Sequence, residues 1–261
     1  MHRALLTALF VSVSVPAFAQ DAAPAGQAAE PAGQATAPAG QATAPAGQAT
    51  DAPAPALSPD QIKAFNQAVS DFTAGQQAQQ SGDNVTASAK YEAALPAIRD
   101  AVKVQPDNID NVNFLANALY AAAAAKAGLQ QLDAVPPLYE ESLPYWRKVI
   151  AARPTDAQSR GVLTGILIQL GNFKLGKQDK AGAAPYYAEA LPLARKAVAE
   201  KSDAINKNIL LSALIGASQT SDDPAIKAEA VTMSKAMIAD NSVDAINKPS
   251  AQALAGTPAA K

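Results

Sequence analysis

The chain has 261 residues, of which 17% are charged, and a formal net charge of −2 at pH 7. It contains no cysteine, and its single histidine is His2, so the rest of the chain has neither a thiol nor an imidazole. This excludes Ser-His-Asp and Cys-His catalysis, zinc sites with nitrogen or sulfur ligands, haem ligated by His or Cys, and disulfides, and we expect no metal and no cofactor.

Residues 1–19 have the pattern of a secretory signal peptide. A positive start precedes a short apolar run, and Ala17-Phe18-Ala19 forms a cleavage site of the A-x-A type. We therefore expect a periplasmic or secreted protein that begins at Gln20 and does not span the membrane. An uncleaved anchor is the alternative, although the run is short for a span of about 20 residues.

Residues 20–57 repeat the heptapeptide A-P-A-G-Q-A-T, with Pro24, Pro31, Pro38 and Pro45 at its recurring position. The segment cannot bury enough apolar surface to offset the entropy of ordering it, and its prolines block a continuous helix. We predict a disordered low-complexity linker. Binding to a cell-wall polymer is the alternative, but aromatic and basic residues that would stack or pair are missing.

Acidic and basic residues are equal in number from residue 52 onward. No cluster of lysines and arginines of the kind that neutralises phosphates is present. We therefore expect an ordinary solvated surface and no nucleic-acid partner.

One signature recurs three times at intervals of 48 residues. Its copies are Tyr91, Leu95, Pro96 and Arg99; Tyr139, Leu143, Pro144 and Arg147; and Tyr187, Leu191, Pro192 and Arg195. Self-similarity at a period of this size indicates an array of stacked repeats, which usually offers a surface for binding and not a pocket for chemistry.

Each repeat is predicted to be a pair of helices. Apolar residues spaced i, i+3, i+7 share one face of the second helices, and a further set lies in the first helices. The second-helix trios are Leu95, Ile98 and Val102; Leu143, Trp146 and Ile150; Leu191, Ala194 and Val198; the first-helix pairs are Leu115 and Leu119, Leu163 and Leu167, Leu211 and Ile215. No alternating strand pattern competes, so the chain is predicted to be all-α.

Punctuating residues mark the expected helix ends. Gly128 and Gly176 are expected to end first helices, and Asp133 and Asp179 to cap the second helices that follow. Pro106 and Pro154 are expected to stop second helices. The sequence Asn84-Val85-Thr86 matches a glycosylation acceptor, but we interpret it as the start of a helix.

These residues resemble the tetratricopeptide repeat family, whose unit is normally about 34 residues. The matching positions in the second helix are Ala94, Ser142 and Ala190, then Ile98, Trp146 and Ala194, then Ala101, Val149 and Ala197; in the first helix they are Leu115, Leu163 and Leu211, followed by Ala116, Thr164 and Ser212. The longer unit, Val149 at a small position and the proline inside each second helix depart from the family pattern.

The resemblance covers roughly residues 58–245. A fourth second helix is displaced by 40 residues and places Ala230, Val231 and Lys235 opposite Ala190, Leu191 and Arg195, while a first helix with Phe65, Ala68 and Phe72 fits loosely. The resemblance implies an all-α, right-handed solenoid of about four helical hairpins after the disordered N-terminal segment. Residues 246–261 are expected to be a flexible C-terminal tail.

The family's geometry implies an inner wall lined by the first helices. Its positions hold Asn113, Phe114, Asn117 and Tyr120; Gly161, Val162, Gly165 and Ile168; and Ile209, Leu210, Ala213 and Gly216. The family's basic clamp for acidic peptide tails has no match here. The expected site is an Asn-bearing, partly apolar groove for an extended peptide, formed by Asn113, Phe114, Asn117, Tyr120, Val162 and Leu210. Alternatively, Phe114, Val162 and Leu210 are ordinary core between repeats.

Two further recurring sets of residues are interpreted structurally. The prolines Pro96, Pro144 and Pro192 are expected to kink their helices and set the curvature of the stack, the alternative being that the carbonyls freed at Glu92, Glu140 and Ala188 bind something. The arginines Arg99, Arg147 and Arg195 are expected to pair with acids of neighbouring repeats, the alternative being a basic ladder for a polyanion.

Glu140 and Glu141 invite comparison with a catalytic carboxylate pair. Neighbouring residues on a helix point about 100° apart, so these two carboxylates cannot flank one bond. We interpret them as a charged first half of the helix, favourable to its dipole.

The sequence therefore predicts a non-catalytic periplasmic scaffold or adaptor that binds a protein or an extended peptide. A first alternative is a cell-envelope enzyme accessory or a carboxylate-based hydrolase of cell-wall glycan, but no stretch of about 100 residues outside the repeats remains for a catalytic domain. A second alternative is a structural spacer or a self-assembly module.

Overall fold

The computed structural model describes residues 56–256, so the predicted signal peptide and almost all of the predicted linker lie outside the described residues. The described residues are helical throughout, with no strand, as predicted. The helices are α1 (Pro59–Gln80), α2 (Asn84–Val104), α3 (Ile109–Gly128), α4 (Val135–Ala152), α5 (Ala157–Gly176), α6 (Lys180–Glu200), α7 (Ala204–Thr220), α8 (Pro224–Ala239) and α9 (Lys248–Ala255), with a 3-10 turn at Leu132–Ala134.

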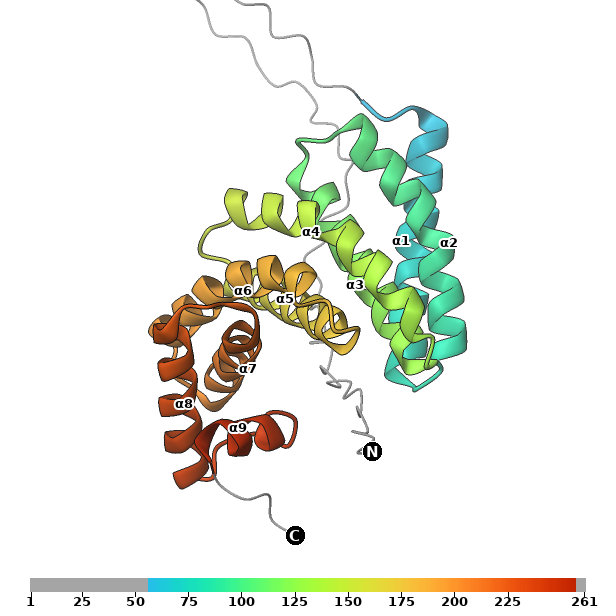
Figure 1. Cartoon of the computed structure of the whole chain (residues 1–261). Helices are drawn as coiled ribbons and strands as arrows, with labels where there is room; N and C mark the ends of the chain where they lie inside the picture. Colours follow the sequence, from blue (N-terminus) through green and yellow to red (C-terminus); the bar gives the residue numbers. More distant parts are fainter. Residues whose placement is uncertain (1–55, 257–261) are drawn as a thin grey trace, which may run out of the picture. The chain divides into compact units, whose positions relative to one another are not determined.

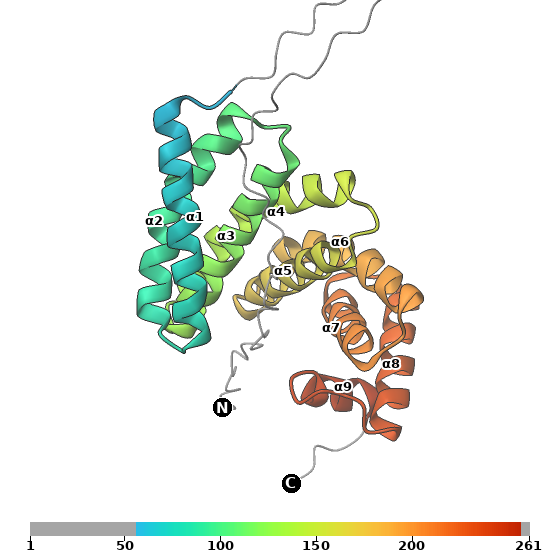
Figure 2. The same ribbon diagram turned by 180° about the vertical axis from the view of Figure 1, so that it is seen from behind.

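Consecutive helices pack side by side (Figures 1 and 2). The helices α1 to α8 form four pairs in chain order, and each pair contacts the next because α2 packs on α3, α4 on α5 and α6 on α7. The predicted pairing of helices is confirmed. The leucines expected to face the neighbouring helices are buried in both kinds of helix: Leu95, Leu143 and Leu191 in the second helices, Leu115, Leu163 and Leu211 in the first.

Short acidic and amide side chains begin most of the helices. Asp179 accepts a hydrogen bond from the backbone N–H of Gly182 and caps α6, as predicted. Asp133 does not cap α4, so that prediction is wrong: it lies inside the 3-10 turn, and α4 begins without a side-chain cap. The position that corresponds to the capping aspartates Asp83 and Asp179 is Gln131, which makes no cap hydrogen bond.

The turn inside each of the first three helix pairs uses a left-handed residue. Gly82, Gln130 and Gln178 lie 48 residues apart and have φ values of 83°, 59° and 62°. Gly128 and Gly176 end α3 and α5 as predicted. Gly128 has a packing role as well, because a Cβ added there would lie 2.5 Å from Nδ2 of Asn84.

Prolines stop some helices and lie inside others. The helices α2 and α4 end two residues before Pro106 and Pro154, as predicted. Pro96, Pro144 and Pro192 lie inside α2, α4 and α6, which remain continuous, and all three are exposed. Their missing N–H groups therefore fall on the solvent side of each helix.

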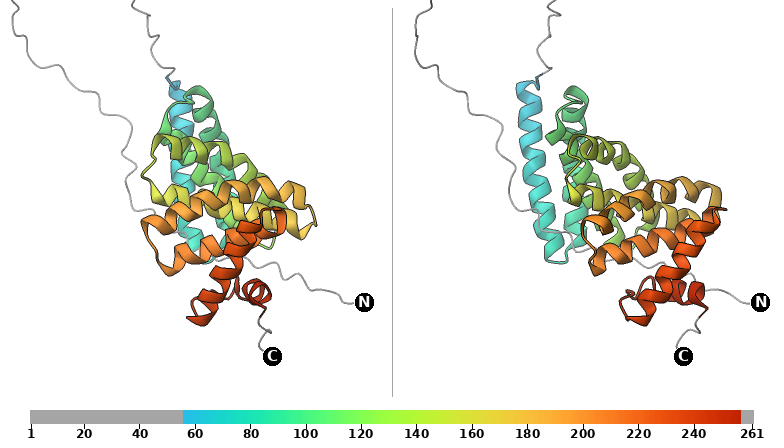
Figure 3. Two further views of the ribbon diagram at one scale, coloured as in Figure 1. Left: turned by 60° about the vertical axis from the view of Figure 1, so that its left-hand side comes forward. Right: turned by 90° about the vertical axis from the view of Figure 1, so that its left-hand side faces the viewer.

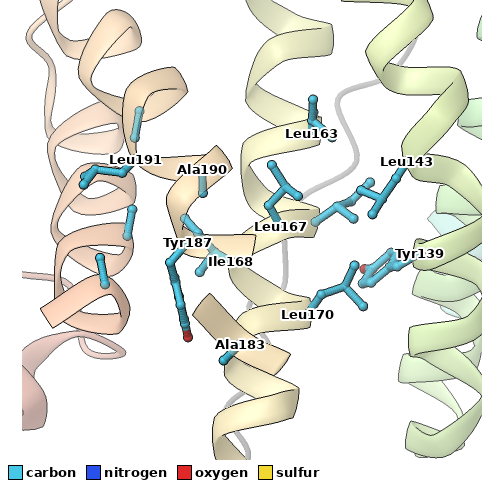
Figure 4. Packing of buried hydrophobic residues seen from close by; sticks show 14 of the residues in the cluster. Tyr139, Leu143, Leu163, Leu167, Ile168, Leu170, Ala183, Tyr187, Ala190 and Leu191 are labelled. Atoms are coloured by element: carbon cyan, nitrogen blue, oxygen red, sulfur yellow. The ribbon is translucent and has the colours of Figure 1, made fainter. Parts of the chain in front are cut away.

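Two hydrophobic clusters hold most of the described helices together. One gathers buried residues of α1, α2 and α3 with Val149 of α4, and the other gathers residues of α4 to α7, with additions from α3 and α8. In Figure 4, Tyr139 and Leu143 of α4 point toward Leu167 and Leu170 of α5. The fully buried Trp146 of α4 belongs to the second cluster.

A ninth helix occupies part of the segment expected to be a flexible tail. The helix α9 packs on α8 (Figure 3), and its Ala251 is fully buried. The segment before it is fixed by side-chain amides: Nδ2 of Asn247 donates to the carbonyl of Asn208 over 3.0 Å, and the N–H of Asp244 donates to Oδ1 of Asn208 over 2.9 Å. Residues 248–255 of this segment therefore form a helix that the sequence did not predict.

Within residues 56–256, no helix combines the length and the apolar character that crossing a membrane requires.

Candidate functional site

The six residues predicted to line a groove lie in three odd-numbered helices. Four of them come from α3, Val162 comes from α5 and Leu210 from α7. Leu210 is buried, and the other five are half-buried. The six residues divide into an asparagine pair and four apolar or aromatic side chains that contact the two hydrophobic clusters.

The asparagine pair is Asn113 and Asn117, one turn apart on α3. The Nδ2 of Asn117 donates to the carbonyl oxygen of Asn113 over 2.8 Å and to its Oδ1 over 3.1 Å. The Oδ1 of Asn117 is buried and has no hydrogen-bond partner among the described residues. This oxygen is therefore an acceptor whose bonding capacity is unused.

The aromatic residues of α3 pack against neighbouring helices. Phe114 meets Phe65 and Phe72 of α1 edge to face, with ring centroids 5.7 and 5.1 Å apart. Tyr120 stacks on Tyr139 of α4 at 6.0 Å, and burial raises the pKa of both phenols. These side chains tie α3 to α1 and α4.

Val162 and Leu210 belong to the packing of the second cluster. Leu210 is one of the buried members of this cluster, and the partly buried Val162 and Tyr120 pack against the cluster. Phe114 packs against the other cluster. The structure thus brings Tyr120, Val162 and Leu210 to one cluster and keeps Phe114 apart from them.

Two glycines of α5 complete the predicted inner wall. Gly161 and Gly165 correspond to Asn113 and Asn117, and both are half-buried. A Cβ added at either position would meet no atom within 4 Å. By contrast, a Cβ at Gly171 would collide with Tyr187. The packing of the described residues therefore gives no reason for glycine at 161 and 165, although each costs about 1 kcal/mol relative to alanine in a helix.

The sequence contained a signal for these two positions. Gly161 and Gly165 are one turn apart in the interior of a predicted helix, where glycine is unfavourable without a packing or functional reason. Both lie on the predicted inner wall, outside the six residues predicted to form the site.

Glu140 and Glu141 bond to different helices. Glu141 accepts two hydrogen bonds from Arg99 of α2, from Nε over 2.7 Å and from Nη2 over 2.9 Å. Glu140 accepts a hydrogen bond from the hydroxyl of Tyr186 of α6 over 3.2 Å. Because the two carboxylates are engaged with separate partners, they do not form a pair.

The repeated arginines are paired with acids of the next helix pair, as predicted. Arg99 bonds to Glu141, Arg147 to Glu189, and Arg195 to Glu229. The hydrogen bonds to Glu141 and Glu189 raise the pKa values of Arg99 and Arg147. Each guanidinium is therefore neutralised by its own carboxylate, which disfavours a basic ladder for a polyanion.

Across residues 56–256, acidic, histidine and cysteine side chains form no group of three that could hold a metal ion. The chain matches no known protein-family model, and no curated protein matches it.

Proposed function

We propose that this protein is a non-catalytic binding scaffold of the periplasm or the cell exterior, built as a right-handed, tetratricopeptide-like solenoid of helix pairs. The repeated pairs, the recurring 48-residue signature and the pattern of residues 1–19 support this proposal. Its ligand is a protein segment or peptide in extended conformation.

The binding face consists of Asn113 and Asn117 on α3 with Gly161 and Gly165 on α5. The open space above the two glycines carries the proposal, because it lets a peptide backbone approach closer than any side chain would allow. The half-buried Asn113 offers its side-chain amide to the backbone of the ligand, and Asn117 holds that amide in place by its hydrogen bond to Oδ1 of Asn113. In this arrangement the packing that holds the face in place comes from Phe114, Tyr120, Val162 and Leu210.

Replacement of the two glycines separates binding from folding. In Gly161→Leu/Gly165→Leu the new side chains fill the open space, while the helix exchanges two poor helix formers for good ones. We therefore expect peptides selected from a random display library on the parent protein to bind the double variant at least about tenfold more weakly. The melting temperature should stay the same or rise.

The asparagines give an independent arm. Asn113→Ala/Asn117→Ala should weaken the binding of the same peptides, since each hydrogen bond lost at an interface costs about 1 kcal/mol. Asn66→Ala, at an exposed asparagine of α1, is the matched control. Fluorescence anisotropy gives the affinities and circular dichroism the melting temperatures. Unchanged peptide affinities in both double variants would show that this face is not the binding site.

A further inference from the structure

An acid and a base six residues apart recur on three even-numbered helices. The pairs are Glu141 and Arg147 on α4, Glu189 and Arg195 on α6, and Glu229 and Lys235 on α8. In each pair the carboxylate accepts hydrogen bonds from an arginine of the preceding even-numbered helix. Arg147 and Arg195 in turn donate hydrogen bonds to a carboxylate of the following one. The resulting ion pairs form a head-to-tail series that we call the ladder: Arg99–Glu141, Arg147–Glu189 and Arg195–Glu229.

Each rung of the ladder is bidentate. Arg147 donates from Nε to Oε1 of Glu189 over 2.8 Å and from Nη2 to Oε2 over 2.6 Å, and the other two rungs use the same atoms. Two parallel hydrogen bonds fix the orientation of both side chains as well as their separation. A rung therefore resists changes of distance between the helices that it joins.

The helices joined by the ladder do not pack extensively on one another. Among the described residues, α2, α4, α6 and α8 pack on the odd-numbered helices that lie between them in the chain. Side-chain bridges thus span the interval between successive even-numbered helices, which are otherwise linked through the odd-numbered helix between them.

The ladder stops at both ends of the series. On α2 the acceptor position holds the exposed Ala93, and on α8 the donor position holds the exposed Lys235, which makes no ion pair within residues 56–256. The ladder therefore has three rungs among the described helices, one between each two successive even-numbered helices from α2 to α8.

We propose that the three Arg–Glu pairs set the spacing between successive even-numbered helices and make that spacing dependent on ionic strength. The side chains of all three rungs are between one third and one half exposed, so dissolved ions reach them and screen their attraction. The apolar contacts of the odd-numbered helices persist when the rungs weaken, so the helices move apart without unfolding. This device does not depend on the proposed peptide-binding function.

The interval between α6 and α8 offers the cleanest test, because the chain has no cysteine of its own. Spin labels on Ala188→Cys in α6 and Ala236→Cys in α8, both at exposed positions, report the distance by pulsed electron resonance. Arg195→Glu and Glu229→Arg each break the rung, and we expect each to shift the distance distribution to longer values. The exchanged pair, Arg195→Glu with Glu229→Arg, should restore the parent distance.

Lys196→Glu is the matched control. The substitution makes the same change of charge one residue away from Arg195, but Lys196 pairs with Glu200 inside α6 and joins no other described helix. Its distance should equal that of the parent. Raising sodium chloride from about 0.01 M to about 1 M shortens the screening length from about 30 Å to about 3 Å. The parent should then approach the distance of Arg195→Glu, which should itself stay constant.

Circular dichroism shows whether each charge-reversal variant folds. If one does not, Arg195→Gln and Glu229→Gln replace the charge reversals in the distance measurement. Equal distances in the parent and in the folded rung variants would overturn the proposal, and so would a shift in Lys196→Glu as large as that in Arg195→Glu.

Discussion

The ring of Tyr187 occupies the space that a side chain at Gly171 would need: a Cβ added to Gly171 would lie 2.7 Å from Cζ of the tyrosine. Gly216 of α7 faces the same ring still more closely. Gly75 and Tyr91 repeat the relationship at the same spacing of 16 residues, again at 2.7 Å. Glycine in α1, α5 and α7 thus lets a buried tyrosine of a neighbouring helix lie against the backbone.

Gly171→Ala and Gly216→Ala should each lower the free energy of unfolding by about 1–3 kcal/mol, because the added methyl group overpacks a buried ring. Gly161→Ala is the control, since its methyl group meets open space and should raise that free energy by up to about 1 kcal/mol. Urea unfolding followed by circular dichroism measures all three. Similar effects at the three positions would contradict the role assigned to the Tyr187 contact.

Gln130→Gly should stabilise the protein by about 0.5–1 kcal/mol. Gln130 has a φ of 59°, a left-handed conformation that strains a residue with a Cβ and that glycine adopts freely. Gln131→Gly makes the same chemical change at a residue with a φ of −84°, where it removes no strain. Thermal melting of the two variants should show opposite shifts, and two equal shifts would rule out relief of backbone strain.

The stability of the protein should fall above pH about 10. Burial raises the pKa of Tyr91 to about 12, and it raises the pKa values of Tyr139 and Tyr187 as well, whereas an exposed tyrosine titrates near 10. The unfolded chain therefore releases these phenolic protons first. The tyrosine contribution to the free energy of unfolding is complete below pH about 10 and is lost as the pH rises from there toward about 12.

Tyr91→Phe should make this alkaline loss less steep. The substitution also removes the hydrogen bond from the Tyr91 hydroxyl to Oε1 of Gln79, 2.8 Å long, so the slopes against pH are compared and not the absolute free energies. Urea unfolding at a series of pH values between about 8 and about 11 provides the slopes. A slope equal to that of the parent protein would show that Tyr91 does not titrate differently in the two states.

The sequence predicted best those features that follow from equivalence between repeats. Arg99, Arg147 and Arg195 recur at one position, so a pairing that suits one of them suits all three. The contact of Gly171 with Tyr187 was open to the same argument, because Gly75, Ala123 and Gly171 also recur 48 residues apart. That recurrence places α1 in register with α3 and α5, although its own apolar residues fit only loosely.

Features that occur in only one helix pair were not predicted. The cap expected at Asp133 failed because the turn before α4 is built differently from the turns before α2 and α6. The helix α9 was missed because its N-terminal approach depends on the amides of Asn208 and Asn247, which lie far apart in the sequence. The open space at Gly161 could not be anticipated, since periodicity shows which residues correspond but not how far apart their helices lie.

The head-to-tail ladder makes the array extensible. If residues 153–200 were duplicated in tandem, Arg195 of the first copy would meet Glu189 of the second, and Arg195 of the second would meet Glu229. A longer chain of this kind gains one helix pair and one ion pair without any new surface chemistry. Growth of the array by internal gene duplication thus requires no compensating substitution in the ladder, whereas Ala93 gives an added N-terminal pair no carboxylate to bind.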